Sequence, residues 1–179
     1  ILVQEALQEN LLNKIAREIV DKNKRIILIA GPSSSGKTTF SHRLAIQLKI
    51  HGLRPHPISL DDFFRDRHYS PKDEYGNYDF ESIECLDIPL FHQCMMNLLD
   101  GKEVVMPRYN FITGISERME KPLKIQKNDV LIIEGIHGLN EKLSKDLPKE
   151  CKYKIYVSAL TQLAIDQHNR IPTTDGRLI

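Results

Sequence analysis

The stretch Gly31-Pro32-Ser33-Ser34-Ser35-Gly36-Lys37-Thr38 decides the fold of this chain, because it fits the pattern G-x-x-x-x-G-K-[ST] of a phosphate-binding loop. Residues 25–30 before it form an apolar run typical of a short buried strand, and residues 39–50 after it are typical of a helix. The glycines of such a loop let backbone N–H groups turn toward phosphate oxygens, and the helix N-terminus adds partial positive charge. The strand–loop–helix order therefore predicts a site for the phosphates of a nucleoside triphosphate.

The side chains of this loop have specific expected roles. Lys37 is expected to reach the β- and γ-phosphates, and the hydroxyl of Thr38 is expected to ligate Mg²⁺. The residues expected to contact the nucleotide are Gly31, Ser33, Ser34, Ser35, Gly36, Lys37, Thr38 and Thr39. The expected cofactors are ATP or GTP, together with Mg²⁺.

The overall composition favours a single domain and excludes several classes of protein. The chain has 179 residues, enough for one well-buried core. A net charge of +1 leaves no basic surplus for binding nucleic acid or an anionic membrane, and the apolar runs are too short to cross a bilayer. The cysteines, Cys85, Cys94 and Cys151, are odd in number and widely spaced, which predicts free thiols and a cytoplasmic location.

The two ends of the chain suggest that it belongs to a longer polypeptide. It begins without methionine, inside an apolar pattern of helical spacing over residues 2–20. We expect residues 1–21 to form an amphipathic helix that packs on the core, joins an upstream domain or binds a partner. Residues 22–179 are expected to form the main domain, which stops without a terminating turn.

The pattern of the remaining segments predicts an α/β fold. Further strands are expected at residues 57–60, 130–133 and 154–157, a helix after Asp87, and an antiparallel hairpin from residues 104–111 and 117–125. Strands that alternate with helices favour a mainly parallel sheet flanked by helices, as in P-loop NTPases. The small hairpin is expected to serve the substrate.

Two acidic residues stand where predicted strands end. Glu134 ends the apolar run 130–133, where an acid facing the loop would help to hold Mg²⁺; a surface carboxylate is the alternative. Asp61 follows the strand 57–60, and ligands of α/β folds collect beyond the carboxyl ends of strands. Asp61 is therefore a candidate base for phosphoryl transfer to an alcohol, with helix capping as the alternative.

Several motifs together resemble the uridine kinase family, close to phosphoribulokinase. The motifs are GPSSSGKTTF (31–40), SLDDFF (59–64), SPKDEYGNYDFE (70–81), CLD (85–87), PRYNF (107–111) and IIEGIHGL (132–139). The resemblance covers roughly residues 26–140 and resumes at 173–179. It implies a kinase that uses ATP or GTP to phosphorylate the 5′-hydroxyl of uridine or cytidine, as in pyrimidine salvage.

The resemblance also implies roles for individual residues. Asp61 matches the catalytic base of the family, and Lys37 matches its phosphate-binding lysine. Thr38 and Glu134 match the residues that hold Mg²⁺. The implied substrate-binding residues are Asp61, Phe64, Glu81, Tyr109 and Arg177. Glu81 stands where the family usually has an aspartate that holds the sugar hydroxyls. Tyr109 matches the aromatic residue beside the nucleobase, and Arg177 resembles the first lid arginine. The resemblance places the other lid arginines after Ile179, so we expect residues 22–179 to carry only part of the lid.

Two departures from the family pattern leave the acceptor open. Phe64 stands where animal uridine kinases have tyrosine, and Gly114 stands where they have a histidine that contacts the base. A lost hydrogen bond of this kind changes discrimination strongly. The alternatives are a kinase for another small alcohol, such as a phosphorylated sugar or a pantothenate-like compound, and a nucleotide-binding regulatory module of a longer protein. A homo-oligomer is compatible with either.

Overall fold

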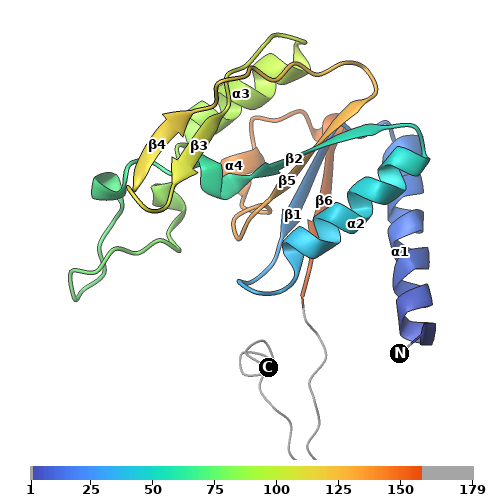
Figure 1. The fold of residues 1–179 in the computed structure, drawn as a ribbon, viewed down its shortest axis with the longest axis horizontal. Coiled ribbons are helices and arrows are strands. Elements are labelled where there is room, and N and C mark those ends of the chain that lie inside the picture. The colour runs from blue at the N-terminus through green and yellow to red at the C-terminus, as the bar shows by residue number, and fades with distance from the viewer. Residues whose placement is uncertain (1, 159–179) are drawn as a thin grey trace, which may run out of the picture.

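The computed structural model describes residues 2–158, in which a parallel sheet carries helices on both faces (Figure 1). The sheet has four strands in the order β2-β5-β1-β6, and all neighbouring pairs are parallel. The strands are β1 (Ile26–Ala30), β2 (Arg54–Ser59), β5 (Asp129–Glu134) and β6 (Lys152–Tyr156). The α/β architecture predicted from the apolar runs is therefore confirmed.

Alternate residues of β1 point to opposite faces of the sheet and enter separate cores. Ile27 and Ile29 pack with α1 (Leu2–Asp21) and α2 (Lys37–Ile50). On the other face, Ile26 and Leu28 share a core with residues of α3 (Ile88–Leu99) and α4 (Glu141–Ser144). Because both faces are covered, β1 and β5 are apolar along nearly their whole length.

The first helix buries apolar side chains against the domain only in its second half. Leu12, Ala16 and Ile19 are buried in the core with α2, and an ion pair joins Arg43 of α2 to Glu9 of α1. The apolar side chains of the first half are more than half exposed: Leu2, Val3, Leu7 and Leu11. The apolar stripe seen in the sequence therefore extends beyond the surface that α2 covers.

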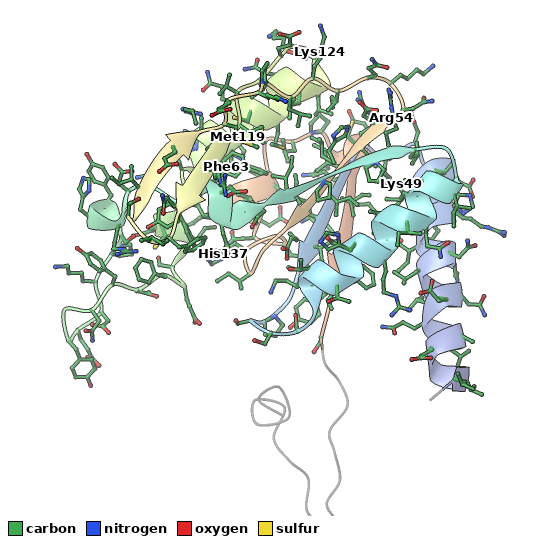
Figure 2. The ribbon with its side chains drawn as sticks, viewed as in Figure 1. Lys49, Arg54, Phe63, Met119, Lys124 and His137 are labelled. Carbon is green, nitrogen blue, oxygen red and sulfur yellow. The ribbon has the colours of Figure 1, made fainter. Side chains whose placement is uncertain are left out.

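An antiparallel hairpin forms the second, smaller sheet, which lies beside α3 in Figure 1. Its strands are β3 (Pro107–Asn110) and β4 (Ile115–Arg118), shorter than the predicted arms, although Val104 still pairs with Leu123. Residues 63–80 are rich in charged and aromatic residues without a steady period, a pattern that predicts a surface loop. That prediction is wrong at its start, because Phe63 is buried in the core, edge-on to Phe91, between the sheet and the hairpin (Figure 2).

The helix predicted after Asp87 is confirmed as α3. Asp87 precedes the helix, and its Oδ1 accepts a hydrogen bond of 2.9 Å from Leu90 N. Within residues 2–158, no helix has both the length and the apolar character needed to cross a bilayer.

Candidate active site

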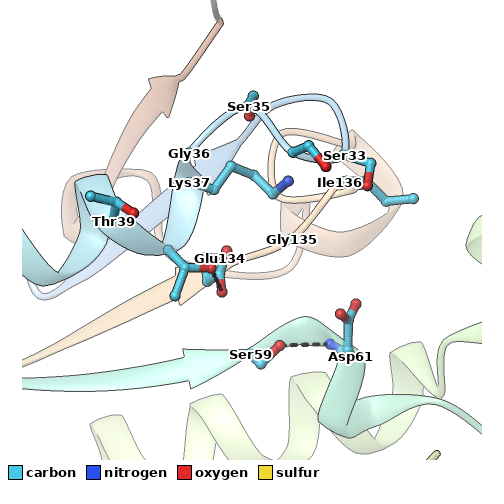
Figure 3. Close-up of a pocket in the computed structure, with 12 residues that line it drawn as sticks. Ser33, Ser35, Gly36, Lys37, Thr39, Ser59, Asp61, Glu134, Gly135 and Ile136 are labelled. Carbon is cyan, nitrogen blue, oxygen red and sulfur yellow. Dashed lines mark hydrogen bonds between the residues drawn. The ribbon is translucent and has the colours of Figure 1, made fainter. Parts of the chain in front are cut away.

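The carboxyl ends of β1, β5 and β2 meet at one cavity of about 380 Å³ (Figure 3). Its walls come from the loop after β1, the loop after β5 and the turn after β2. The lining residues are Ser33, Ser34, Ser35, Gly36, Lys37, Thr38, Thr39, Ser59, Asp61, Glu134, Gly135 and Ile136. Segments distant in the sequence are therefore brought together at one edge of the sheet, where α/β folds bind ligands.

The loop between β1 and α2 is open and shaped to hold an anion. Ser34 and Gly36 have positive φ values of 57° and 84°, which curl the backbone around the cavity. Helix α2 has no side-chain cap at Gly36, so the first N–H groups of the helix face the cavity without a side-chain acceptor. The buried hydroxyl of Ser35 also lacks a hydrogen-bond partner within residues 2–158. These donors fit the phosphates of a nucleotide.

Gly31 has a structural role in this loop. A Cβ atom added at Gly31 would lie 2.1 Å from the carbonyl oxygen of Val157. Only glycine therefore allows the segment that follows β6 to approach the loop so closely. Gly31 is absent from the cavity lining, unlike the other residues predicted to contact the nucleotide.

Lys37 and Thr38 occupy the first turn of α2. Lys37 Nζ donates a hydrogen bond of 2.8 Å to the carbonyl oxygen of Pro32 in the loop. Thr38 Oγ1 donates one of 2.8 Å to Glu134 Oε1, at the end of β5. Hydroxyl and carboxylate oxygens are the ligands that Mg²⁺ prefers, and this pair fits an ion that also takes phosphate oxygens. The described residues contain no group of three or more His, Cys, Asp and Glu that could bind a metal unaided.

Asp61 faces the phosphate-binding loop from the opposite side of the cavity (Figure 3). Its backbone N–H donates to Ser59 Oγ at 3.2 Å, which holds the turn Leu60–Phe63 in place. Although Asp61 is exposed by its accessible surface, partial desolvation of its carboxylate by the surrounding protein raises its pKa, and the negative charge of Glu134 raises it further, whereas the charge of Lys37 lowers it. A carboxylate with a raised pKa is a better proton acceptor than an ordinary aspartate.

The neighbouring acid, Asp62, has a different environment. Its Oδ1 accepts a hydrogen bond of 3.4 Å from the backbone N–H of Tyr109, which attaches β3 to the turn that carries Asp61. Burial raises the pKa of Asp62, while the bond from Tyr109 and the charge of Arg108 oppose that shift. Asp62 thus connects the hairpin to the site, a role that no local pattern indicated.

Three aromatic side chains, which we call the aromatic trio, lie next to the turn that carries Asp61: Phe64, Tyr109 and Phe111. Their rings pack edge to face, with centroids 5.4 Å apart for Phe64 and Tyr109 and 5.0 Å apart for Tyr109 and Phe111. Phe64 and Tyr109 are buried, but Phe111 is 59% exposed. Two rings of the trio are therefore fixed by packing, and the third, that of Phe111, is accessible to a ligand.

Of the predicted substrate residues, Asp61 lines this cavity, whereas Phe64 and Tyr109 are absent from its lining and pack beside the turn that carries Asp61. Glu81 is exposed on the loop between Tyr69 and Ile83 and is separate from the cavity lining. Arg177 lies outside the described residues. Conversely, Ser59, Gly135 and Ile136 line the cavity although no role was predicted for them. Local signals for them existed, because Ser59 stands in SLDDFF and Gly135 and Ile136 stand in IIEGIHGL, at or just after strand ends.

Comparison with known proteins places these features in a family. Residues 26–171 match the Phosphoribulokinase / Uridine kinase family. The chain is 31% identical over 143 residues to a uridine kinase of Staphylococcus carnosus (strain TM300), covering 78% of this chain and 64% of the relative. It is 32% identical over 139 residues to a uridine kinase of Saccharomyces cerevisiae, covering 75% of this chain and 26% of the relative. The chain thus spans less than two thirds of the length of either relative.

A solved structure shares the fold. The protein described as a possible uridine kinase from Bacillus stearothermophilus superposes with a TM-score of 0.66 at 20% sequence identity, over 87% of this chain and 81% of that one. At this identity the likeness is one of fold.

Proposed function

Because the chain belongs to the phosphoribulokinase/uridine kinase family, we propose that the protein transfers the γ-phosphoryl group of ATP to the 5′-hydroxyl of a nucleoside such as uridine or cytidine. The observation that carries this proposal is the placement of Asp61 and Lys37 in one cavity with Glu134. A phosphoryl-transfer site needs a phosphate cradle with an acid across from it, and this cavity has both.

In the proposed reaction, the phosphates of ATP lie in the loop of residues 31–38, and Lys37 leaves Pro32 O to contact them. Asp61 accepts the proton of the acceptor hydroxyl. The acceptor oxygen bonds to the γ-phosphorus while the bond from that phosphorus to the β–γ bridging oxygen breaks, and ADP leaves. Mg²⁺ held by Thr38 and Glu134 would neutralise phosphate charge.

The aromatic trio supports a flat, ring-containing acceptor. Aromatic side chains bind nucleobases through their faces and edges, and Phe111 has an exposed ring close to the site. We propose that Phe64 and Tyr109 form the base of this acceptor wall. Glu81 and Arg177 are proposed to join the acceptor site from the loop before α3 and from the end of the chain.

The cellular setting follows from the same proposal. A nucleoside kinase of this type would act in pyrimidine salvage in the cytoplasm, and the free thiols of Cys85, Cys94 and Cys151 suit a reducing compartment. The proposed partners are small molecules.

The test is ADP release by the full-length protein with a panel of nucleosides and other small alcohols. We expect uridine or cytidine to be preferred, and Asp61→Asn to lower kcat by about 10²–10⁴-fold. Asp62→Asn is the matched control, because asparagine still accepts the bond from Tyr109 N. Equal rates for Asp61→Asn and the wild type would exclude the base assignment. Preference for a non-nucleoside alcohol would favour the alternative kinase.

A further inference from the structure

The tip of the β3–β4 hairpin is tied to the segment that follows the aromatic residue Phe64. The backbone N–H of Arg67 donates to the carbonyl oxygen of Gly114 at 2.8 Å, and Arg67 Nη2 donates to the carbonyl oxygen of Phe111 at 2.6 Å. One residue earlier, Asp66 Oδ1 accepts from the backbone N–H of Ser116 at 2.7 Å. Three hydrogen bonds thus join two segments about 50 residues apart in sequence.

The hairpin turn is shaped to receive the arginine. Gly114 is buried and has a φ of +72°, and a Cβ atom added there would lie 2.8 Å from Arg67 Nε and 2.9 Å from Arg67 Cβ. The Arg67 side chain therefore fills the space that a side chain at position 114 would need. Asn110 completes the turn: its carbonyl oxygen accepts from Gly114 N, and its Oδ1 accepts from Ile112 N and Thr113 N.

The contact of Arg67 with the tip acts on the aromatic trio. Phe111 provides the carbonyl oxygen that Arg67 binds, and its exposed ring packs edge to face on Tyr109 with an interplanar angle of 83°. Phe64 lies three residues before Arg67 and packs on the same two rings. Because a charged donor makes a stronger hydrogen bond than a neutral one, the guanidinium holds the Phe111 backbone more firmly than the strand pairing alone.

We propose that Arg67 is a positioning residue that holds the hairpin tip, and with it the ring of Phe111, in the arrangement that binds the acceptor. This inference rests on the proposed function and deepens it: Arg67 sets the affinity for the acceptor and has no part in binding ATP. The phosphate-binding loop lies on the other side of the cavity and makes none of the contacts described for Arg67.

The experiment compares Arg67→Ala, Arg67→Lys and the wild type in the full-length protein, with uridine as acceptor. We expect Arg67→Ala to raise the KM for uridine by about 10- to 100-fold, as lost hydrogen bonds from a charged donor imply, and to leave the KM for ATP unchanged. Arg67→Lys keeps the charge and one donor for the Phe111 carbonyl, so we expect an intermediate KM. The matched control is Arg108→Ala, because alternation along β3 places Arg108 on the face opposite Tyr109.

Hydrogen exchange provides a readout that needs no activity. Loss of the guanidinium is expected to speed exchange of the amides in residues 110–116 in Arg67→Ala, and to leave those of the loop 31–38 unchanged. An unchanged KM for uridine in Arg67→Ala, or an equal rise in the KM for ATP, would overturn the proposal. If the wild type phosphorylates no acceptor, the proposed function fails together with the acceptor role. Exchange at residues 110–116 then decides separately whether Arg67 holds the tip.

Discussion

Thr38 Oγ1 lies 2.8 Å from Glu134 Oε1, so a hydrogen bond connects the first turn of α2 to the end of β5. The two residues are 96 positions apart in the sequence, and the strand pairing of β1 with β5 brings them together: Ile29, just before the phosphate-binding loop, is the register partner of Glu134. The same strand end lies beside Ser59 of β2. The contact thus depends on the sheet, and it places a hydroxyl oxygen and a carboxylate oxygen at the cavity.

Replacement of Glu134 by glutamine should weaken Mg²⁺ binding and spare the fold. Glutamine still accepts the hydrogen bond from Thr38 through its amide oxygen but carries no charge. We expect the Mg²⁺ concentration for half-maximal activity to rise about 10- to 100-fold, measured by titration at saturating ATP, with an unchanged Tm. An unaltered Mg²⁺ requirement would show that Glu134 is not near the ion.

Lys37→Ala should weaken ATP binding and nearly abolish transfer. The variant loses the only positive charge among the described residues that line the cavity, and donors of this kind contribute about 10²–10³-fold to kcat. Calorimetry with a non-hydrolysable ATP analogue measures the affinity, and ADP release measures the rate. Lys49→Ala is the control, since Lys49 lies exposed in the last turn of the same helix, far from the loop (Figure 2). Transfer at the wild-type rate in Lys37→Ala would refute the assignment.

Asp61→Asn should make the folded protein more stable at neutral pH while it removes activity. The folded pKa of Asp61 lies above the ordinary value of 3.8, chiefly because of burial and the charge of Glu134. Below pH 3.8 the Asp61 carboxyl is protonated in both the folded and the unfolded protein, so it does not lower the free energy of unfolding. As the pH rises through the raised pKa, the folded protein loses stability, because its carboxylate forms less readily than that of the unfolded chain.

The measurement is urea unfolding of both proteins across a pH series, without nucleotide and with a metal chelator. The gain in stability of Asp61→Asn should grow as the pH rises from 3.8 and level off above the raised pKa. If Asp61→Asn were less stable than the wild type at pH 7, the pKa of Asp61 in the folded protein would not be raised.

Asp129→Asn should have the opposite effect, a loss of stability. Asp129 is buried at the start of β5, where it accepts bonds from Arg54 Nε at 2.6 Å and Gln126 N at 2.8 Å. Burial alone would raise its pKa, but the bonds from Gln126 and Arg54 outweigh burial and lower it. The stabilisation is therefore present above pH 3.8 and is lost as the pH falls through the folded pKa.

We expect Asp129→Asn to lower the free energy of unfolding by about 1.5–3 kcal/mol at pH 7, measured by urea unfolding, with the difference shrinking in acid. Asp100→Asn is the comparison, because Asp100 forms an exposed pair with Lys102 and such pairs contribute little. Equal losses for the two variants would mean that burial of Asp129 adds nothing.

Local sequence was sufficient for the elements and for part of the site. The apolar runs of β1 and β5 and the loop 31–38 carry their structure in adjacent residues, because strand formation and phosphate-loop geometry depend on neighbours in the chain. The end of an apolar run also marked Glu134, and the end of a short strand marked Asp61. These predictions needed no knowledge of which strands pair.

Tertiary structure alone decided the contacts between distant segments. The strand order brought Thr38 to Glu134, the hairpin brought Gly114 against Arg67, and the packing of α2 on α1 left the apolar side chains of the first half of α1 exposed. Periodicity reports which side chains are apolar but not how far a partner extends, so Leu7 and Leu12 look alike in the sequence and differ in burial. Such contacts form between segments that are far apart in the sequence, and patterns within a few residues do not indicate which distant segments pack together.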